Sequence, residues 1–159
     1  MTQTQNYLGI KNGVVVCIQQ LDRHEFSGAF YHAYDPDPVI FRNEPELLRR
    51  LEDFFDSLRF PFSATNTRNF LPHDSDITAY SEEDRIMSDK DVLNHHGEIG
   101  TFIIRVQQRQ NSSWQGRITW VDEDKTIYFR SAWEMMKLID EALDTYRPEA
   151  DQKEVSWED

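Results

Sequence analysis

Two stretches of sequence decide the fold: Val14–His32, VVVCIQQLDRHEFSGAFYH, and Phe102–Trp120, FIIRVQQRQNSSWQGRITW. Aligned without a gap, they place Gln19, Gln20 and Gly28 on Gln107, Gln108 and Gly116, always 88 positions apart. The same offset continues from Pro38–Arg59 to Thr126–Arg147. It adds five identities, namely Phe41 with Phe129, Arg42 with Arg130, Glu46 with Glu134, Asp56 with Asp144 and Arg59 with Arg147.

An ungapped match over several elements indicates an internal duplication, with repeat one at 14–59 and repeat two at 102–147. The alternative is convergent patterning of two amphipathic units, because such patterns are generic. Both interpretations predict the same elements in each half.

Each half is predicted to contain three strands and one helix. The first strand, VVVCIQQ or FIIRVQQ, is rich in β-branched residues, and the second alternates apolar and polar positions with the period of a strand. The segments DPDP and DEDK are predicted to turn the chain into a short third strand, VIF or TIYF. Gly28 and Gly116 indicate a bulge or the crossing of a large aromatic ring.

One helix per half is predicted from apolar residues at helical spacing. In the first half they are Leu47, Leu48, Leu51, Phe54, Phe55 and Leu58; in the second they are Met135, Met136, Ile139, Ala142, Leu143 and Tyr146. The predicted fold class is therefore α+β: two βββα repeats related by a pseudo-twofold axis, each an antiparallel sheet with one helix, sharing one core.

The predicted domain spans 1–148, with a connection at 60–100 between the repeats and an acidic tail at 149–159. The connection is too long for an ordinary loop, and Ser81 with Asp84 and Ser88 with Asp91 form capping-box patterns. One or two short helices are predicted there, from Ser81 to about His95.

Composition limits the classes of function. The chain has 17 basic and 29 acidic residues, a net charge of −12, of which Asp140–Asp159 contributes 2 − 8 = −6. Such a balance opposes direct binding to nucleic acid. The single cysteine, Cys17, lies in an apolar run, so we expect a buried, inert thiol. With no membrane-spanning stretch and no signal peptide, a soluble cytoplasmic protein is expected.

The motif FRNEPE at Phe41–Glu46 returns as FRSAWE at Phe129–Glu134. Asn43 and Ser131 are predicted to cap the two helices, with Glu46 and Glu134 completing capping boxes. Arg42 and Arg130 are then the candidate ligand-binding residues, because a guanidinium beside helical amides can hold an anion. The competing interpretation is an ion pair with a nearby carboxylate.

Two histidine groups suggest a metal site: His73 with Asp74 and Asp76, and His95 with His96 and Glu98. Their spacing differs from that of helical zinc sites, so no metal and no cofactor are predicted. His32 aligns with Trp120 and is expected to be a partly buried, hydrogen-bonded ring. No serine lies in a nucleophile elbow and no phosphate loop is present, so no catalytic residue is predicted.

The segment WQGRITW at 114–120, followed by FRSAWEMMKLIDEAL at 129–143, resembles a group of short, uncharacterised bacterial proteins of the Firmicutes. The match covers about the last third of the chain up to Leu143. The first half departs from the pattern at Phe26, His32 and Asn43. The resemblance implies a small repeated or dimerising module with no established activity.

Three hypotheses about function follow. The preferred one is a non-enzymatic module that binds a basic protein partner, for example as an acidic mimic of nucleic acid of the anti-defence type. Its predicted partner-binding surface is acidic: Glu52, Asp53, Asp56, Asp140, Glu141 and Asp144. The alternatives are a sensor of a small anionic ligand such as a cyclic dinucleotide, and, last, a metal-dependent hydrolase.

Overall fold

A computed structural model describes residues 12–22, 25–58, 70, 85–110 and 113–146. Its elements in chain order are β1 (Val14–Leu21), β2 (Phe26–His32), β3 (Asp35–Phe41), α1 (Glu44–Leu58), α2 (Asp89–Leu93), β4 (Gly100–Gln110), β5 (Ser113–Trp120), a 3-10 turn (Val121–Glu123), β6 (Lys125–Phe129) and α3 (Ala132–Asp144). None of the described helices is long and apolar enough to cross a membrane.

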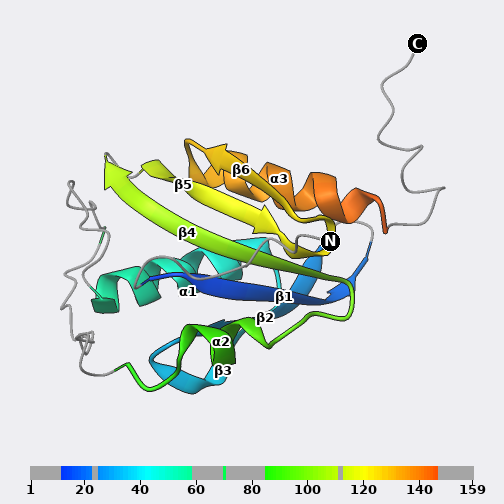
Figure 1. Ribbon diagram of the computed structural model, residues 1–159. Helices are drawn as coiled ribbons and strands as arrows, with labels where there is room; N and C mark the ends of the chain where they lie inside the picture. Colours follow the sequence, from blue (N-terminus) through cyan, green and yellow to red (C-terminus); the bar gives the residue numbers. More distant parts are fainter. Residues whose placement is uncertain (1–11, 23–24, 59–69, 71–84, 111–112, 147–159) are drawn as a thin grey trace, which may run out of the picture.

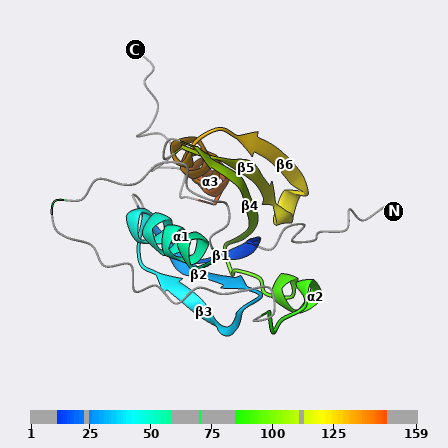
Figure 2. The ribbon, with the colours of Figure 1, turned by 90° about the vertical axis from the view of Figure 1, so that its left-hand side faces the viewer.

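The six strands form one antiparallel sheet in the order β3-β2-β1-β4-β5-β6 (Figure 1). Both long helices, α1 and α3, lie on one side of this curved sheet, whereas the short helix α2 lies on the other side (Figure 2). The predicted α+β class is therefore confirmed, and the strands of the two halves meet in a single sheet.

The two halves join where β1 pairs with β4. Val14 lies opposite Ile104, Val15 opposite Ile103, and Val16 opposite Phe102. All of these side chains are at most 1% exposed, so both faces of the sheet are buried at its centre. A continuous apolar run such as Val14–Ile18 is typical of a strand that is covered on both faces.

The helices close the core on one face of the sheet. Leu47, Leu51 and Phe55 of α1 are fully buried, as are Met135, Ile139 and Leu143 of α3. Each set repeats every three or four residues, which puts its members on a single stripe of the helix. The predicted apolar stripes are thus the surfaces by which α1 and α3 pack, except that Tyr146 lies beyond the end of α3 and is exposed.

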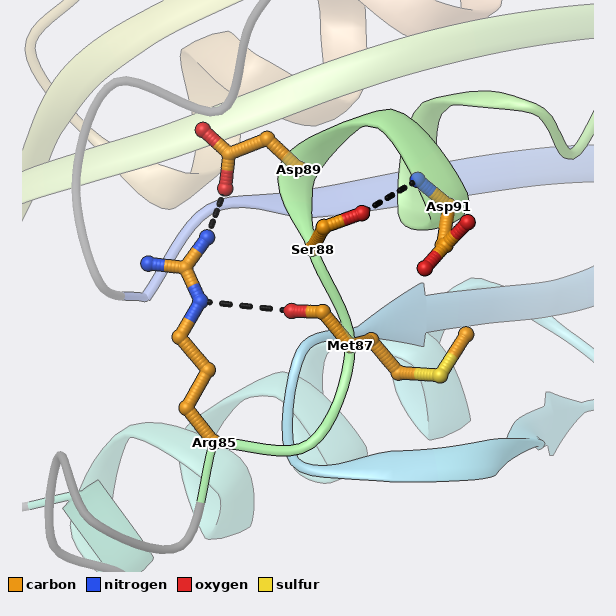
Figure 3. Close-up of polar contacts among 5 residues, drawn as sticks. All are labelled: Arg85, Met87, Ser88, Asp89 and Asp91. Atoms are coloured by element: carbon orange, nitrogen blue, oxygen red, sulfur yellow. Dashed lines mark hydrogen bonds and ion pairs between the residues drawn. The ribbon is translucent and has the colours of Figure 1, made fainter.

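Part of the long connection packs against the opposite face of the sheet. Backbone amides of Ile86 and Met87 both donate to the carbonyl of Ala33. Ser88 then caps α2, its hydroxyl accepting from the amide of Asp91 at 3.2 Å, and Arg85 pairs with Asp89 (Figure 3). The predicted cap at Ser88 is confirmed, whereas the pattern at Ser81 and Asp84 lies outside the described residues.

The prediction for the third strand was wrong at its start. DPDP was expected to be a turn, but β3 begins at Asp35 and contains Pro36 and Pro38. Proline is tolerated in this position because β3 is an edge strand and needs no outward-facing amide donor. The opposite edge strand, β6, begins at Lys125 after the 3-10 turn and contains no proline.

The two mid-strand glycines lie beside β-bulges, as predicted. Gly28 pairs with Ile18 where the register of β1 shifts before Gln20, and Gly116 pairs with Val106 where β4 shifts before Gln108. A Cβ atom on Gly28 would lie 1.9 Å from the carbonyl oxygen of Cys17. One on Gly116 would lie 2.0 Å from that of Arg105. Backbone fills the space of a side chain at both positions.

Replacing either glycine by alanine should therefore destabilise the protein. We expect Gly28→Ala and Gly116→Ala each to lower the free energy of unfolding by more than about 2 kcal/mol, because a strand must move to admit the methyl group. Gly100→Ala is the matched control, since its Cβ would meet nothing closer than a side-chain carbon of Leu143 at 3.5 Å. Urea denaturation measures all three, and equal losses in the three variants would contradict the explanation.

Candidate functional site

The solvent-facing sides of α1 and α3 carry most of the acidic residues singled out in the sequence. Glu52, Asp53 and Glu141 are exposed, whereas Asp56, Asp140 and Asp144 are partly buried. We call these six residues the acidic helical face. Formal charges within α1 sum to 2 − 5 = −3, and those within α3 to 1 − 4 = −3. Because both helices lie on the same side of the sheet (Figure 2), that side is strongly acidic.

One member of the acidic helical face is tied to the body of the protein. The guanidinium of Arg109, 4% exposed, donates to the Asp56 carboxylate at 2.8 Å. It also lies 5.7 Å from the centre of the Phe55 ring. This contact links the end of β4 to α1. Arg109 was not among the residues predicted from the sequence, and in the alignment of the two halves it falls on Leu21.

Neighbouring carboxylates affect Glu52 as well. Although the Glu52 side chain is exposed, the desolvation that neighbouring atoms cause raises the pKa of its carboxyl, and the negative charges of Asp56 and Asp53 act in the same direction. Arg109 opposes this shift. Binding of a cation would relieve this repulsion between carboxylates. The part of the acidic helical face that lies on α1 therefore favours a positively charged group.

The structure does not bring the two candidate arginines together. Arg42 follows β3 and Arg130 follows β6, the two outermost strands of the sheet. Arg42 is paired with Glu46 at 3.6 Å and lines a shallow hollow that also contains Asp22 and Glu25. Its surroundings are therefore acidic, which favours the ion-pair interpretation over an anion site at that position.

The repeated motif caps both long helices. The Asn43 side-chain oxygen accepts from the amide of Glu46 at 2.9 Å, and the Ser131 hydroxyl accepts from the amide of Glu134 at 3.0 Å. In both helices the cap residue therefore satisfies the amide three positions on, as predicted. The Glu46 carboxylate turns toward Arg42 instead of completing a capping box.

The histidines are divided between packing and the surface. The His95 ring stacks on Tyr31 at 3.6 Å between ring centres, and its Nδ1 lies 3.1 Å from the carbonyl of Val92. His96 is exposed. Among the described residues, no three His, Cys, Asp or Glu side chains come close enough to hold a metal ion. The other group, His73 with Asp74 and Asp76, lies outside those residues.

His32 and Cys17 are both enclosed. Burial raises the pKa of the Cys17 thiol to about 12, so the thiolate is not formed at neutral pH. The His32 ring stacks on Phe54 at 4.2 Å between ring centres, and its Nδ1 accepts from the amide of Tyr34 at 3.1 Å. Burial lowers the pKa of His32 to about 4, while Asp35 acts in the opposite direction. The ring is neutral at physiological pH, as expected for a packed side chain.

An apolar pocket lies between α3 and the sheet in the second half. Its wall is formed by Phe102, Ile118, Trp120, Ile127, Leu138 and Ala142. Its rim carries Lys125, Glu141 and Thr145. The cavity volume of about 330 Å³ falls in the range of small-molecule sites. This pocket was not predicted from the sequence, although the alignment of the two halves contained a signal: Phe54 and Phe30 fall on the smaller residues Ala142 and Ile118.

Comparison of the chain with protein-family models, with curated proteins and with solved structures returned no match. We therefore infer function from the residues and their geometry.

Acidification should weaken the fold through His32. The unfolded ring takes up a proton near pH 6.5, but the folded ring does so only near pH 4, so stability falls as the pH drops between these values. From pH 7 to pH 5 we expect a loss of about 2 kcal/mol from this group. Urea denaturation at the two pH values measures it.

His32→Asn supplies the comparison, because its side-chain oxygen can still accept from the Tyr34 amide but does not titrate. We expect this loss to be absent in that variant and retained in His96→Asn, which changes an exposed ring. An unaltered pH dependence in His32→Asn would show that other groups control acid stability.

Proposed function

We propose that the chain is a duplicated βββα unit whose copies, 14–59 and 102–147, are related by a pseudo-twofold axis. The pairing of β1 with β4 supports this. If the two copies are exchanged by the 88-residue offset, Val14 maps to Phe102 and Ile104 maps to Val16. The pair Val14 and Ile104 thus becomes the pair Phe102 and Val16, which is also observed. The same exchange leaves the pair Val15 and Ile103 unchanged, so the axis would pass between these two residues.

Two further coincidences support the duplication. The bulges at Ile18–Gln20 and Val106–Gln108 are 88 positions apart. Each glycine of the pair faces a phenylalanine on its other side, Gly28 facing Phe41 and Gly116 facing Phe129. Convergent patterning explains similar strands and helices, but it gives no reason for matching irregularities.

We further propose that the protein is a non-enzymatic, protein-binding module that presents the acidic helical face to a basic partner. The observation that carries this proposal is the charge of −3 on each of two helices that lie on the same side of the sheet. A surface of one sign attracts an oppositely charged protein and accelerates encounter. The resemblance of 114–143 to a group with no established activity is in keeping with a binding role.

The kind of partner follows from the same charges. The two acidic helices present several carboxylates on regular secondary structure. Such an array can bind the basic groove of a protein whose usual ligand is the phosphate backbone of a nucleic acid. We therefore propose that the module acts as a mimic of nucleic acid and occupies the basic groove of a nucleic-acid-binding protein, as an inhibitor. Mimicry also fits a chain whose net charge of −12 opposes binding to nucleic acid itself.

Charge-neutral variants test this proposal. The binding variant, Glu52→Gln/Asp53→Asn/Glu141→Gln, removes three exposed charges from the acidic helical face. The control, Glu25→Gln/Asp37→Asn/Glu98→Gln, removes three exposed charges from outside the long helices. Each protein is immobilised and incubated with host lysate at low and high salt, and captured proteins are identified by mass spectrometry.

We expect wild type and control to capture a basic nucleic-acid-binding protein at low salt, and high salt to release it. The binding variant should capture at least about tenfold less, because three favourable charge contacts are worth more than 1.4 kcal/mol together. Added double-stranded DNA should displace the partner if the face mimics nucleic acid. Equal capture by both variants, or no capture by wild type, would refute the proposal.

A further inference from the structure

The two halves differ sharply in what fills the space between helix and sheet. In the first half this space holds a cluster of four rings: Phe30, His32, Tyr34 and Phe54. The centre of the Phe54 ring lies 4.2 Å from that of His32, 6.2 Å from that of Phe30 and 6.1 Å from that of Tyr34. All four side chains are at most 5% exposed. The first half is therefore filled by its own aromatic residues.

The residues 88 positions later are Ile118, Trp120, Asp122 and Ala142, so only one of the four positions keeps a ring. Three of them line the apolar pocket, and Asp122 turns away to accept from the backbone amide of Thr101 at 2.9 Å. On the proposed duplication, the pocket is the space that Phe54 occupies in the first half. Its shape is thus suited to one flat ring beside Trp120, as Phe54 lies beside His32.

Aromatic surfaces continue around the pocket. The Phe102 ring is nearly parallel to Trp120, with centres 6.5 Å apart, and Tyr146 meets Trp120 edge-on at the same separation. The ammonium of Lys125 lies 6.0 Å from the centre of the Trp120 ring. The Trp120 face therefore already holds one ammonium group, so a bound amine would have to displace the Lys125 side chain or lie elsewhere on the rim.

Charges near the opening favour a cation. Lys125 and Glu141 on the rim cancel one another. Burial raises the pKa of the Tyr146 hydroxyl, and the negative charges of Asp122 and Glu123 add to the shift, so both carboxylates lie within electrostatic reach of Tyr146, whose ring meets the pocket residue Trp120 edge-on. The four charges sum to 1 − 3 = −2. A carboxylate ligand would meet net repulsion here, and an ammonium group would meet attraction.

We propose that the pocket between α3 and strands β5 and β6 binds a small aromatic molecule that carries an ammonium group. Its ring occupies the place of the missing Phe54 equivalent, over Ala142 and beside Trp120. Its ammonium group lies at the rim, where Glu141 is the nearest acidic residue of the lining. This site shares Glu141 with the acidic helical face, but it lies between α3 and the sheet and does not require a protein to dock on that face.

Phenethylamine is the probe, and phenylacetate, which has the same ring and the opposite charge, is the comparison ligand. Binding to the whole protein is followed by methyl NMR of Ile118, Ile127 and Leu138, with affinity from the titration. We expect phenethylamine to shift these three methyl signals and to bind more tightly than phenylacetate. Glu141→Gln should reduce the phenethylamine affinity by about threefold to tenfold and reduce the preference for the amine.

The most direct test is a substitution that fills the pocket with a side chain of the protein. Ala142→Phe places a ring where the first half has one, so it should reduce phenethylamine affinity at least about tenfold and leave the melting temperature unchanged or higher. Ala132→Phe makes the same change on the same helix outside the pocket and should bind as wild type does. If Ala142→Phe does not fold, Ile118→Phe takes its place in the test. It also adds a ring to the lining of the pocket, the one that the first half has at the aligned position, Phe30.

Three results would overturn the proposal: no shift of the three methyl signals with phenethylamine, undiminished binding by the folded filled variant, or phenylacetate binding as tightly as the amine. Binding by the protein partner to the acidic helical face is measured separately, by capture. The capture experiment can therefore fail while this one succeeds, and the reverse is equally observable.

Discussion

The pairing of β1 with β4 is the contact on which the rest of the structure depends. It joins strands from the two halves by a ladder that runs from Val14 and Ile104 to Ile18 and Gly100. A three-stranded sheet taken alone would leave β1, or β4, as an apolar edge strand with unpaired backbone groups. When two such sheets join edge to edge, the edge strands β1 and β4 gain partners on both sides, and α1 and α3 lie on the same side of the joined sheet. Val15 and Ile103, which pair at the middle of this junction, are buried by elements of both halves.

Joining the halves through β1 and β4 leaves β3 and β6 as the outer strands, and the chain treats these two edges differently. Pro36 and Pro38 remove amide donors from β3, a common way to prevent unwanted strand pairing. β6 contains no proline, and Ile127 and Tyr128 are about half exposed. The second half is therefore the more open one, both at its edge and in its interior, where Ala142 takes the place of Phe54.

Much of the fold could be predicted from the sequence, because it depends on local patterns. The apolar stripes around Leu51 and Ile139, the caps at Asn43 and Ser131, and the bulges beside Gly28 and Gly116 each leave a mark within a few residues. The start of β3 could not be predicted in this way. Whether Pro36 ends a strand or sits within one depends on whether that strand is at an edge, and strand order is a property of the whole sheet.

The site was harder to predict, because its members come together only in three dimensions. Arg42 and Arg130 look equivalent in the sequence, yet the sheet order places them behind opposite outer strands. Arg109 has no counterpart in the first half, so the repeat pattern gave no hint that it pairs with Asp56. For the pocket, the informative positions were those at which the repeats differ. Positions at which the halves are similar indicate elements that both halves share. A position at which one half has a large ring and the other has a small side chain indicates a cavity in the second, because the fold forms without that ring.

A single chain with two unequal halves has a physical advantage over a symmetric pair of identical units. In an identical pair, any pocket opened in one unit is opened in the other, and the core loses packing twice. Here the ring cluster of Phe30, His32 and Phe54 keeps the first half densely packed, while the second half carries the cavity. On the proposed duplication, the first half supplies stability and the second is free to specialise. The lowered pKa of His32 is a consequence of that division, because the ring that helps to fill the first half is buried.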